Sequence, residues 1–218
     1  MQFRNTIRAS FLALAALMAL GADGTARAQI TSAPVDTPIP SALIDSVNSI
    51  VDSDASRITS IFKDLHQHPE IGFTETRTAA IVSKNLKALG FTVSEGIAKT
   101  GDVGVLKNGA GPTLWFRADM DSNAVHEVTG LAYAATTKQR LTDGTEIDVM
   151  HACGHDAHVT WLLGVAKVMA SMRAQWSGTL VVYAQPGEEL GLGGMHIAPP
   201  HAVGDLASSM GSCGRRAW

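Results

Sequence analysis

The segment HACGHDAH, residues 151 to 158, places three histidines, a cysteine and an aspartate within eight positions. Cys153 and His155 are two residues apart, so in an extended chain their side chains point to the same side. Gly154 between them has no side chain and leaves room for an ion to approach. Because thiolate and imidazole are preferred zinc ligands, we interpret Cys153 and His155 as candidate metal ligands.

Two acidic groups stand at or just after the ends of apolar segments elsewhere in the chain. Asp119 and Asp121 lie in RADMD, and Glu188 and Glu189 follow Pro-Gly in QPGEE. In open α/β sheets the loops after strand ends line the binding crevice. If these loops converge on the histidine cluster, they add carboxylates to thiolate and imidazole, a set that suits zinc or manganese.

Glu188 and Glu189 can take different roles if they occupy a turn. One carboxylate can bind the metal while the other accepts a proton from a metal-bound water, which is the division that metal-assisted hydrolysis requires. The residue types alone do not say which glutamate has which role.

The cluster at 151–158 permits other interpretations. Cys153 could be a thiol nucleophile with a histidine base, or it could pair with Cys213 in an oxidising compartment. His151 and His158 could each bind a metal, support a ligand or pack against the site. Asp156 fits the cap of the following helix and could accept a hydrogen bond from a ligand imidazole. The segment could also be a polar loop without a metal.

The elements around these loops alternate between two periodicities. Apolar spacing predicts helices over about 43–66, with a break near Ser53, over about 75–89 and over about 156–173. Strand patterns fall at 91–95, 104–108, 113–119 and 178–186, with a short hairpin over 142–150. Helices that alternate with strands indicate a layered α/β sheet.

The composition is that of a globular protein of one sizeable domain. The chain has 218 residues, of which 45% are hydrophobic and 17% charged, and a formal net charge of −3. This charge gives no electrostatic reason to expect nucleic acid or an anionic membrane as a partner.

Residues 1–28 have the three-part pattern of a secretory signal peptide. Two arginines precede the charge-free apolar run 11–21, and Ala26 and Ala28 form a small-residue cleavage pattern. The apolar run is shorter than the about 20 residues that span a bilayer. We therefore expect cleavage after Ala28 and export to a bacterial periplasm, with no membrane attachment afterwards.

Segments along the chain resemble, in order, the N-terminal motifs of the zinc-type amidohydrolases. They are LHQHPEIGFTETRTA, FRADMD, MHACGHDAHVT and AQPGEELGLGG, within about residues 53–194. This family includes hippurate hydrolase, N-acyl-amino-acid amidohydrolase and indole-acetyl-amino-acid hydrolase, and is related to the aminoacylase and carboxypeptidase metallopeptidases. The resemblance implies a mixed, mostly parallel sheet flanked by helices. It also implies a metal-dependent hydrolase of the amide bond in N-acyl amino acids or short peptides.

The resemblance implies a role for each candidate site residue. Cys153, His155 and Glu189 match metal ligands. Glu188 matches the general base, and Asp121 matches the acidic residue that supports the site. The metal would be zinc or manganese, with two ions in a full-length family site and one or none for the ligands present here. The segment SNAV after Asp121 departs from the commoner family sequence, which concerns substrate choice.

The resemblance stops near Gly194. Family members are considerably longer and have a lid-like dimerisation domain, whereas residues 195–218 contain adjacent prolines and scattered glycine and serine. We expect a frameshift or a truncated gene. The predicted organisation is a signal peptide (1–28), an arm with the start of the first helix (29–52), the N-terminal part of the catalytic domain (53–194) and a non-family tail (195–218).

The expected function is therefore a metal-dependent amidohydrolase, impaired by truncation. The alternatives are a catalytically dead periplasmic fragment that binds a metal or ligand, a thiol hydrolase, and a chain that does not fold. The expected partner is a small N-acyl amino acid or peptide substrate, and the sequence does not define an oligomeric state.

Overall fold

Three α-helices form in the part of the chain that the computed structural model describes, residues 38–193. They are α1 (Ser41–Gln67), α2 (Thr76–Ala88) and α3 (His155–Ser171). The predicted break near Ser53 is wrong, because α1 is continuous. The Ser53 hydroxyl donates to the Ile50 carbonyl at 2.8 Å, so this polar side chain bonds along the helix without interrupting it.

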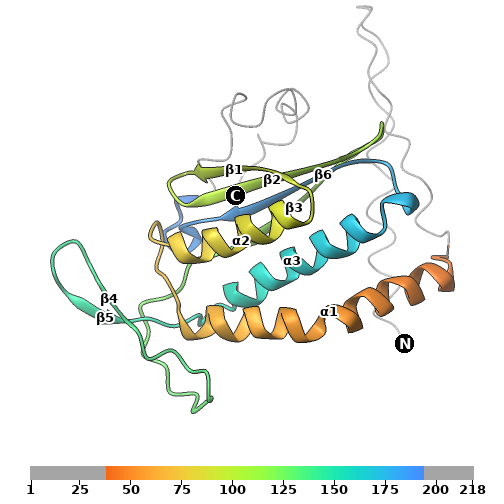
Figure 1. The fold of residues 1–218 in the computed structure, drawn as a ribbon. Coiled ribbons are helices and arrows are strands. Elements are labelled where there is room, and N and C mark those ends of the chain that lie inside the picture. The colour runs from red at the N-terminus through yellow and green to blue at the C-terminus, as the bar shows by residue number, and fades with distance from the viewer. Residues whose placement is uncertain (1–37, 194–218) are drawn as a thin grey trace, which may run out of the picture. The chain divides into compact units, whose positions relative to one another are not determined.

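The strands form a mixed sheet in the order β1, β2, β6, β3 (Figure 1). Their bounds are Thr92–Ile97 for β1, Gly101–Asn108 for β2, Thr113–Asp119 for β3 and Gly178–Gln185 for β6. The predicted mixed sheet with flanking helices is confirmed. Its parallel character is confined, among the described strands, to the β3–β6 pair, since β1–β2 and β2–β6 are antiparallel. The reason is connectivity: a tight turn joins β1 to β2, whereas α3 crosses between β3 and β6.

A separate hairpin, β4 (Lys138–Arg140) with β5 (Glu146–Asp148), extends from the loops at one end of this sheet. Short 3₁₀ turns, η1 (Arg173–Gln175) and η2 (Glu188–Leu190), precede and follow β6.

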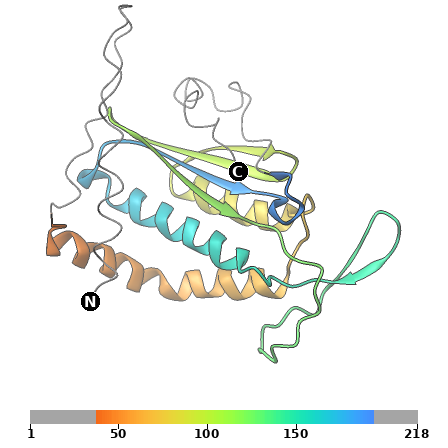
Figure 2. The ribbon, with the colours of Figure 1, turned by 180° about the vertical axis from the view of Figure 1, so that it is seen from behind.

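Helices α2 and α3 pack on one face of the sheet, and α1 lies on the same side and packs against α3, as the two opposite views in Figures 1 and 2 show. The core between these layers is apolar, and its largest fully buried side chains include Leu65, Leu86, Leu106, Leu162, Leu163 and Leu180. Gly104 on β2 permits the close packing of α2, because a Cβ there would lie 2.9 Å from Leu86 Cδ1. On the opposite face of the sheet, a smaller cluster contains Val103, Val181 and Tyr183.

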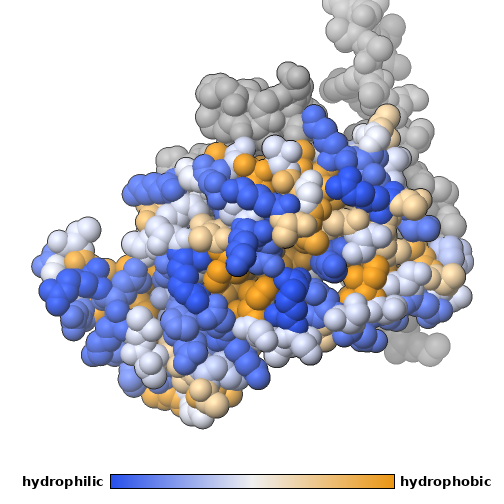
Figure 3. Space-filling view, in the orientation of Figure 1, coloured by the Kyte–Doolittle hydropathy of each residue, from blue (hydrophilic) through white to orange (hydrophobic). Residues whose placement is uncertain are grey.

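The surface on the helix side is mostly hydrophilic, with hydrophobic residues in patches (Figure 3). None of the helices within residues 38–193 combines the length and apolar character that crossing a membrane requires. The predicted signal peptide and the predicted tail lie outside the described residues.

Candidate metal centre

The parallel β3–β6 pair brings two of the predicted site loops to one edge of the sheet. Asp119 at the end of β3 is in register with Gln185 at the end of β6. The Met120 N–H donates to the Gln185 carbonyl at 2.9 Å, which extends the pairing beyond the strand. Asp121 and the Glu188–Glu189 pair therefore leave the sheet next to each other, as the sequence predicted for loops at strand ends.

His155 reaches the same edge from the first residue of α3 and is 3% exposed. Its Nδ1 lies 2.7 Å from the backbone carbonyl of Asp121. Because a carbonyl only accepts hydrogen bonds, Nδ1 must donate, and the lone pair of a neutral His155 is on Nε2. That Nε2 lies 3.8 Å from Glu188 Oε2 and 3.9 Å from Glu189 Oε1.

His155, Glu188 and Glu189 thus form a three-residue group whose ligand atoms all lie within 4.8 Å of one another. One imidazole and two carboxylates fit a divalent ion such as zinc or manganese. The nearly equal distances from His155 to the two glutamates do not divide the roles of ligand and base, so that division stays a prediction.

Asp121 contacts both the His155 ring and the backbone of Glu189, and it is 1% exposed. Its Oδ2 accepts a hydrogen bond of 2.9 Å from the backbone N–H of Glu189, and its Oδ1 lies 3.2 Å from His155 Nδ1. Burial alone would raise the pKa of Asp121, but the contacts with His155 and the Glu189 N–H outweigh it and lower that pKa. Burial alone would lower the pKa of the His155 imidazole, but the contacts with Asp121 outweigh this effect and raise that pKa.

Cys153 lies at the rim of the group and is exposed. Its backbone N–H donates to Asn123 Oδ1 at 3.2 Å, which fixes the turn before α3. A hydrogen bond with the Glu189 carboxylate raises the pKa of the Cys153 thiol. The thiol therefore faces a predicted ligand but is not part of the three-residue group, and its role as a ligand stays a prediction. Cys213 is outside the described residues.

The start of α3 differs from the prediction. Gly154, with φ of 75°, is the N-cap, and Asp156 lies inside the first turn without capping it. Its Oδ2 instead contacts His66 Nδ1 at 2.7 Å, so it is not paired with the ligand imidazole of His155. The prediction that Asp156 caps the helix is therefore wrong. Because the left-handed backbone of Gly154 begins the helix earlier than expected, the Asp156 carboxylate is available to His66.

His151 is 4% exposed and belongs to neither of the metal-ligand groups found within residues 38–193. Neither ring nitrogen has a hydrogen-bond partner among the described residues. Burial lowers the pKa of His151 to about 4, so the imidazole is neutral at pH 7. This supports a packing role, one of the alternatives that the sequence left open.

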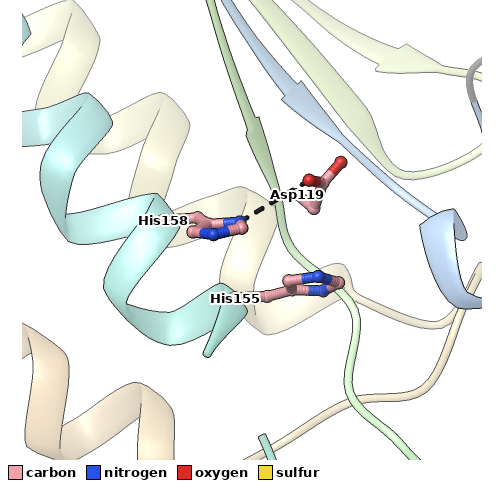
Figure 4. A group of neighbouring side chains, drawn as sticks. All are labelled: Asp119, His155 and His158. Carbon is pink, nitrogen blue, oxygen red and sulfur yellow. Dashed lines mark ion pairs between the residues drawn. The ribbon is translucent and has the colours of Figure 1, made fainter. Parts of the chain in front are cut away.

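A second group combines Asp119, His155 and His158 (Figure 4). His155 and His158 are three residues apart on α3, so both rings lie on one helix face, stacked with centroids 5.1 Å apart. His158 Nδ1 lies 3.5 Å from Asp119 Oδ2. The sequence left His158 open and assigned Asp119 no separate role.

Two glutamates in HPEIGFTE, a segment with no assigned role, also shape the site. Glu70 accepts hydrogen bonds from the backbone N–H groups of Arg77 and Thr78, in the first turn of α2. Glu75 is fully buried and accepts a hydrogen bond of 2.8 Å from the Gly187 N–H, directly before Glu188. The position of Glu70 shortly before a predicted helix was the available signal for its contact with the first turn of α2. No sequence pattern indicated that Glu75 would contact Gly187.

Part of the chain is similar to a known family and to several known proteins. Residues 115–209 match the profile of peptidase family M20/M25/M40. Hippurate hydrolase of Campylobacter jejuni is 46% identical over 131 residues, which are 60% of this chain and 31% of that protein. IAA-amino acid hydrolase ILR1-like 4 of Arabidopsis thaliana is 32% identical over 154 residues, 71% of this chain and 33% of that protein.

Among solved structures, the YXEP protein of Bacillus subtilis, a dinuclear metal-binding peptidase of family M20, is 30% identical with a TM-score of 0.60. The match covers 67% of this chain and 39% of that one. The chain spans about a third of the length of the curated relatives that it matches. The family match also includes residues 195–209, so the boundary expected near residue 194 stays a prediction.

Proposed function

We propose that this chain takes part in metal-dependent hydrolysis of amide bonds. The premise is that it belongs to peptidase family M20/M25/M40 and contains part of its catalytic domain. The observation that supports this most directly is the convergence of His155, Glu188 and Glu189 within 4.8 Å, from loops separated in sequence. Asp121 contacts both His155 and the backbone of Glu189, so the group is built into the fold.

A bound zinc or manganese ion would lower the pKa of a water and polarise the scissile carbonyl. The side chains supply the orientation of the site and the proton transfer. Asp121 and its carbonyl orient His155 so that Nε2 faces the site. Glu189 and Cys153 would hold the ion together with His155. Glu188, 41% exposed, is accessible to a substrate and accepts the proton of the attacking water, then returns it to the leaving amine.

The proposed substrates are N-acyl amino acids or short peptides. Support comes from the names of the relatives, which include a hippurate hydrolase and IAA-amino acid hydrolases. We also propose that the protein is exported with cleavage after Ala28, on the strength of the basic, apolar and small-residue pattern of residues 1–28.

The test is metal analysis of the purified chain together with a hippurate-type assay. Dialysis against a chelator should abolish hydrolysis, and added Zn²⁺ or Mn²⁺ should restore it. Glu188→Gln should keep the metal content but lose at least 100-fold in kcat, because general acid–base catalysis contributes about 10²–10⁴-fold. Hydrolysis that survives the chelator and ends with a thiol alkylator would instead support Cys153 as a nucleophile.

A further inference from the structure

Asp119 has a buried oxygen that the candidate centre does not use. The residue is 6% exposed, and its Oδ1 has no hydrogen-bond partner among the described residues. Its Oδ2 accepts a hydrogen bond of 3.0 Å from Arg117 Nη2 and lies 3.5 Å from His158 Nδ1. A buried carboxylate oxygen without a partner destabilises the protein unless a cation or donor meets it.

We infer that Asp119, His155 and His158 form a second position for a divalent metal ion, an alternative to the position between His155, Glu188 and Glu189. One ligand atom from each of the three residues lies within 4.8 Å of those of the other two. The two positions share His155, and the ion binds at one or the other.

The distance between the Asp119 and His158 side chains suits two ligands of one ion. The 3.5 Å between Asp119 Oδ2 and His158 Nδ1 exceeds the usual N–H···O range of about 2.7–3.2 Å. Two atoms bound at about 2.1 Å to one tetrahedral zinc are separated by roughly 3.4 Å. The spacing of this pair therefore matches that of two ligands of one ion.

The surroundings leave room for the rest of a coordination shell. A cavity of about 220 Å³ is lined by Phe116, Arg117, Asp119, His158 and Trp161. Water in this cavity can reach both ligand side chains, so it can fill positions that the protein leaves open. The packing of the His158 ring between His155 and Trp161, with centroids 5.1 and 5.5 Å away, limits its rotation.

His155 makes the two positions exclusive. Because its Nδ1 donates to the Asp121 carbonyl, it offers one lone pair, on Nε2. An ion bound with Cys153 and Glu189 takes that lone pair and leaves only Asp119 and His158 at the second position. Loss of Cys153 and of both glutamates should therefore move an ion to the second position without ending metal binding.

The experiment is Co²⁺ and Zn²⁺ titration of the full chain by calorimetry and Co²⁺ absorption, without an activity assay. The background is the triple variant Cys153→Ser, Glu188→Gln, Glu189→Gln, in which only the second position keeps its ligands. We expect it to bind one Co²⁺ per chain without a thiolate charge-transfer band. Adding Asp119→Asn or His158→Gln should weaken binding at least 10-fold, and adding His155→Gln should do the same.

The matched control on this background is His126→Gln, which removes an exposed histidine that belongs to neither metal-ligand group and should leave the affinity unchanged. Circular dichroism verifies that each variant is folded. The inference is overturned if the folded triple variant binds no Co²⁺, or if His158→Gln and Asp119→Asn change its affinity no more than His126→Gln. Failure of hydrolysis in the unaltered chain would reject the proposed function and leave this result unaffected.

Discussion

Glu75 Oε1 accepts a hydrogen bond of 2.8 Å from the backbone N–H of Gly187, across 112 residues of sequence. Glu75 immediately precedes α2, and Gly187 is the N-cap of the turn that presents Glu188 and Glu189. The carboxyl group is fully buried, and its Oε2 also accepts a hydrogen bond from the Thr100 hydroxyl. The start of α2 therefore fixes the position of the two site glutamates.

Glu75→Ala should destabilise the protein by about 1–3 kcal/mol, because it leaves the buried Gly187 N–H without its acceptor. It should also weaken Zn²⁺ binding, since the turn with Glu189 loses its anchor. Glu75→Gln keeps an oxygen at this point and should recover most of the Zn²⁺ affinity. Urea denaturation and calorimetric titration measure the two effects. Equal Zn²⁺ affinity in all three proteins would show that Glu75 does not position the turn.

Asp121→Ala should lower Zn²⁺ affinity by about 10–100-fold, the usual loss when a partner of a metal ligand is removed. The reason is that Asp121 Oδ2 accepts from the Glu189 N–H and Oδ1 lies 3.2 Å from the His155 ring. Asp121→Asn retains an oxygen for the Glu189 N–H and should lose less. Calorimetry on folded protein checks this, and an alanine variant with unchanged affinity would contradict it.

His66 should make the metal-free protein more stable in mild acid. Burial alone would lower the pKa of His66, but hydrogen bonds with Asp156 and Glu127 outweigh it, and the pKa rises. A histidine with a raised pKa in the folded state contributes its full stabilisation below the ordinary value of about 6.5. That contribution is lost as the pH rises through the folded-state pKa.

The measurement is chelator-treated protein unfolded by urea at pH 6 and pH 8, compared with His66→Gln. The difference in unfolding free energy between the two pH values should shrink by about 1–2 kcal/mol in the variant. His68→Gln, which alters a partly exposed histidine at the C-cap of α1, is the control and should behave as the unaltered chain. An unchanged pH difference in His66→Gln would exclude a charged His66.

The sequence predicted well those features that have a local signal. Helical spacing located α2 within a residue at each end, because apolar stripes reflect which face meets the sheet. The types and order of Cys153, His155, Glu188 and Glu189 predicted a metal site, and the structure brings His155, Glu188 and Glu189 together. Helix boundaries and motif composition depend on residues that are close in sequence, so the sequence alone predicts them.

Contacts between distant segments were not predictable in this way. The pairs His66–Asp156 and Glu75–Gly187 join residues 90 and 112 positions apart, and no periodicity relates them. Asp156 was misplaced as a helix cap for the same reason, since its partner comes from α1. The antiparallel direction of β2 and β6 likewise depends on how the chain crosses the whole sheet, which no strand pattern encodes.

Asp102 should make the protein less stable as the pH rises toward neutrality. This β2 carboxyl is 1% exposed, and its Oδ2 has no hydrogen-bond partner within residues 38–193. Burial, together with the charge of Glu95, raises the pKa of Asp102 to about 7, although Lys87 opposes the shift. A carboxyl whose pKa is higher in the folded state holds its proton there, so folding weakens as the pH rises from about 4 to about 7.

Each pH unit in that window weakens folding by at most about 1.4 kcal/mol through this one group. Asp102→Asn cannot ionise and should flatten the decline in unfolding free energy between pH 5 and pH 7, measured by urea denaturation. Combining it with His66→Gln separates the two groups, because the His66 contribution changes around and above pH 6.5. Asp143→Asn, an exposed carboxylate, is the control and should keep the slope of the unaltered chain. If Asp102→Asn also keeps that slope, the Asp102 carboxyl does not hold its proton at neutral pH in the folded protein.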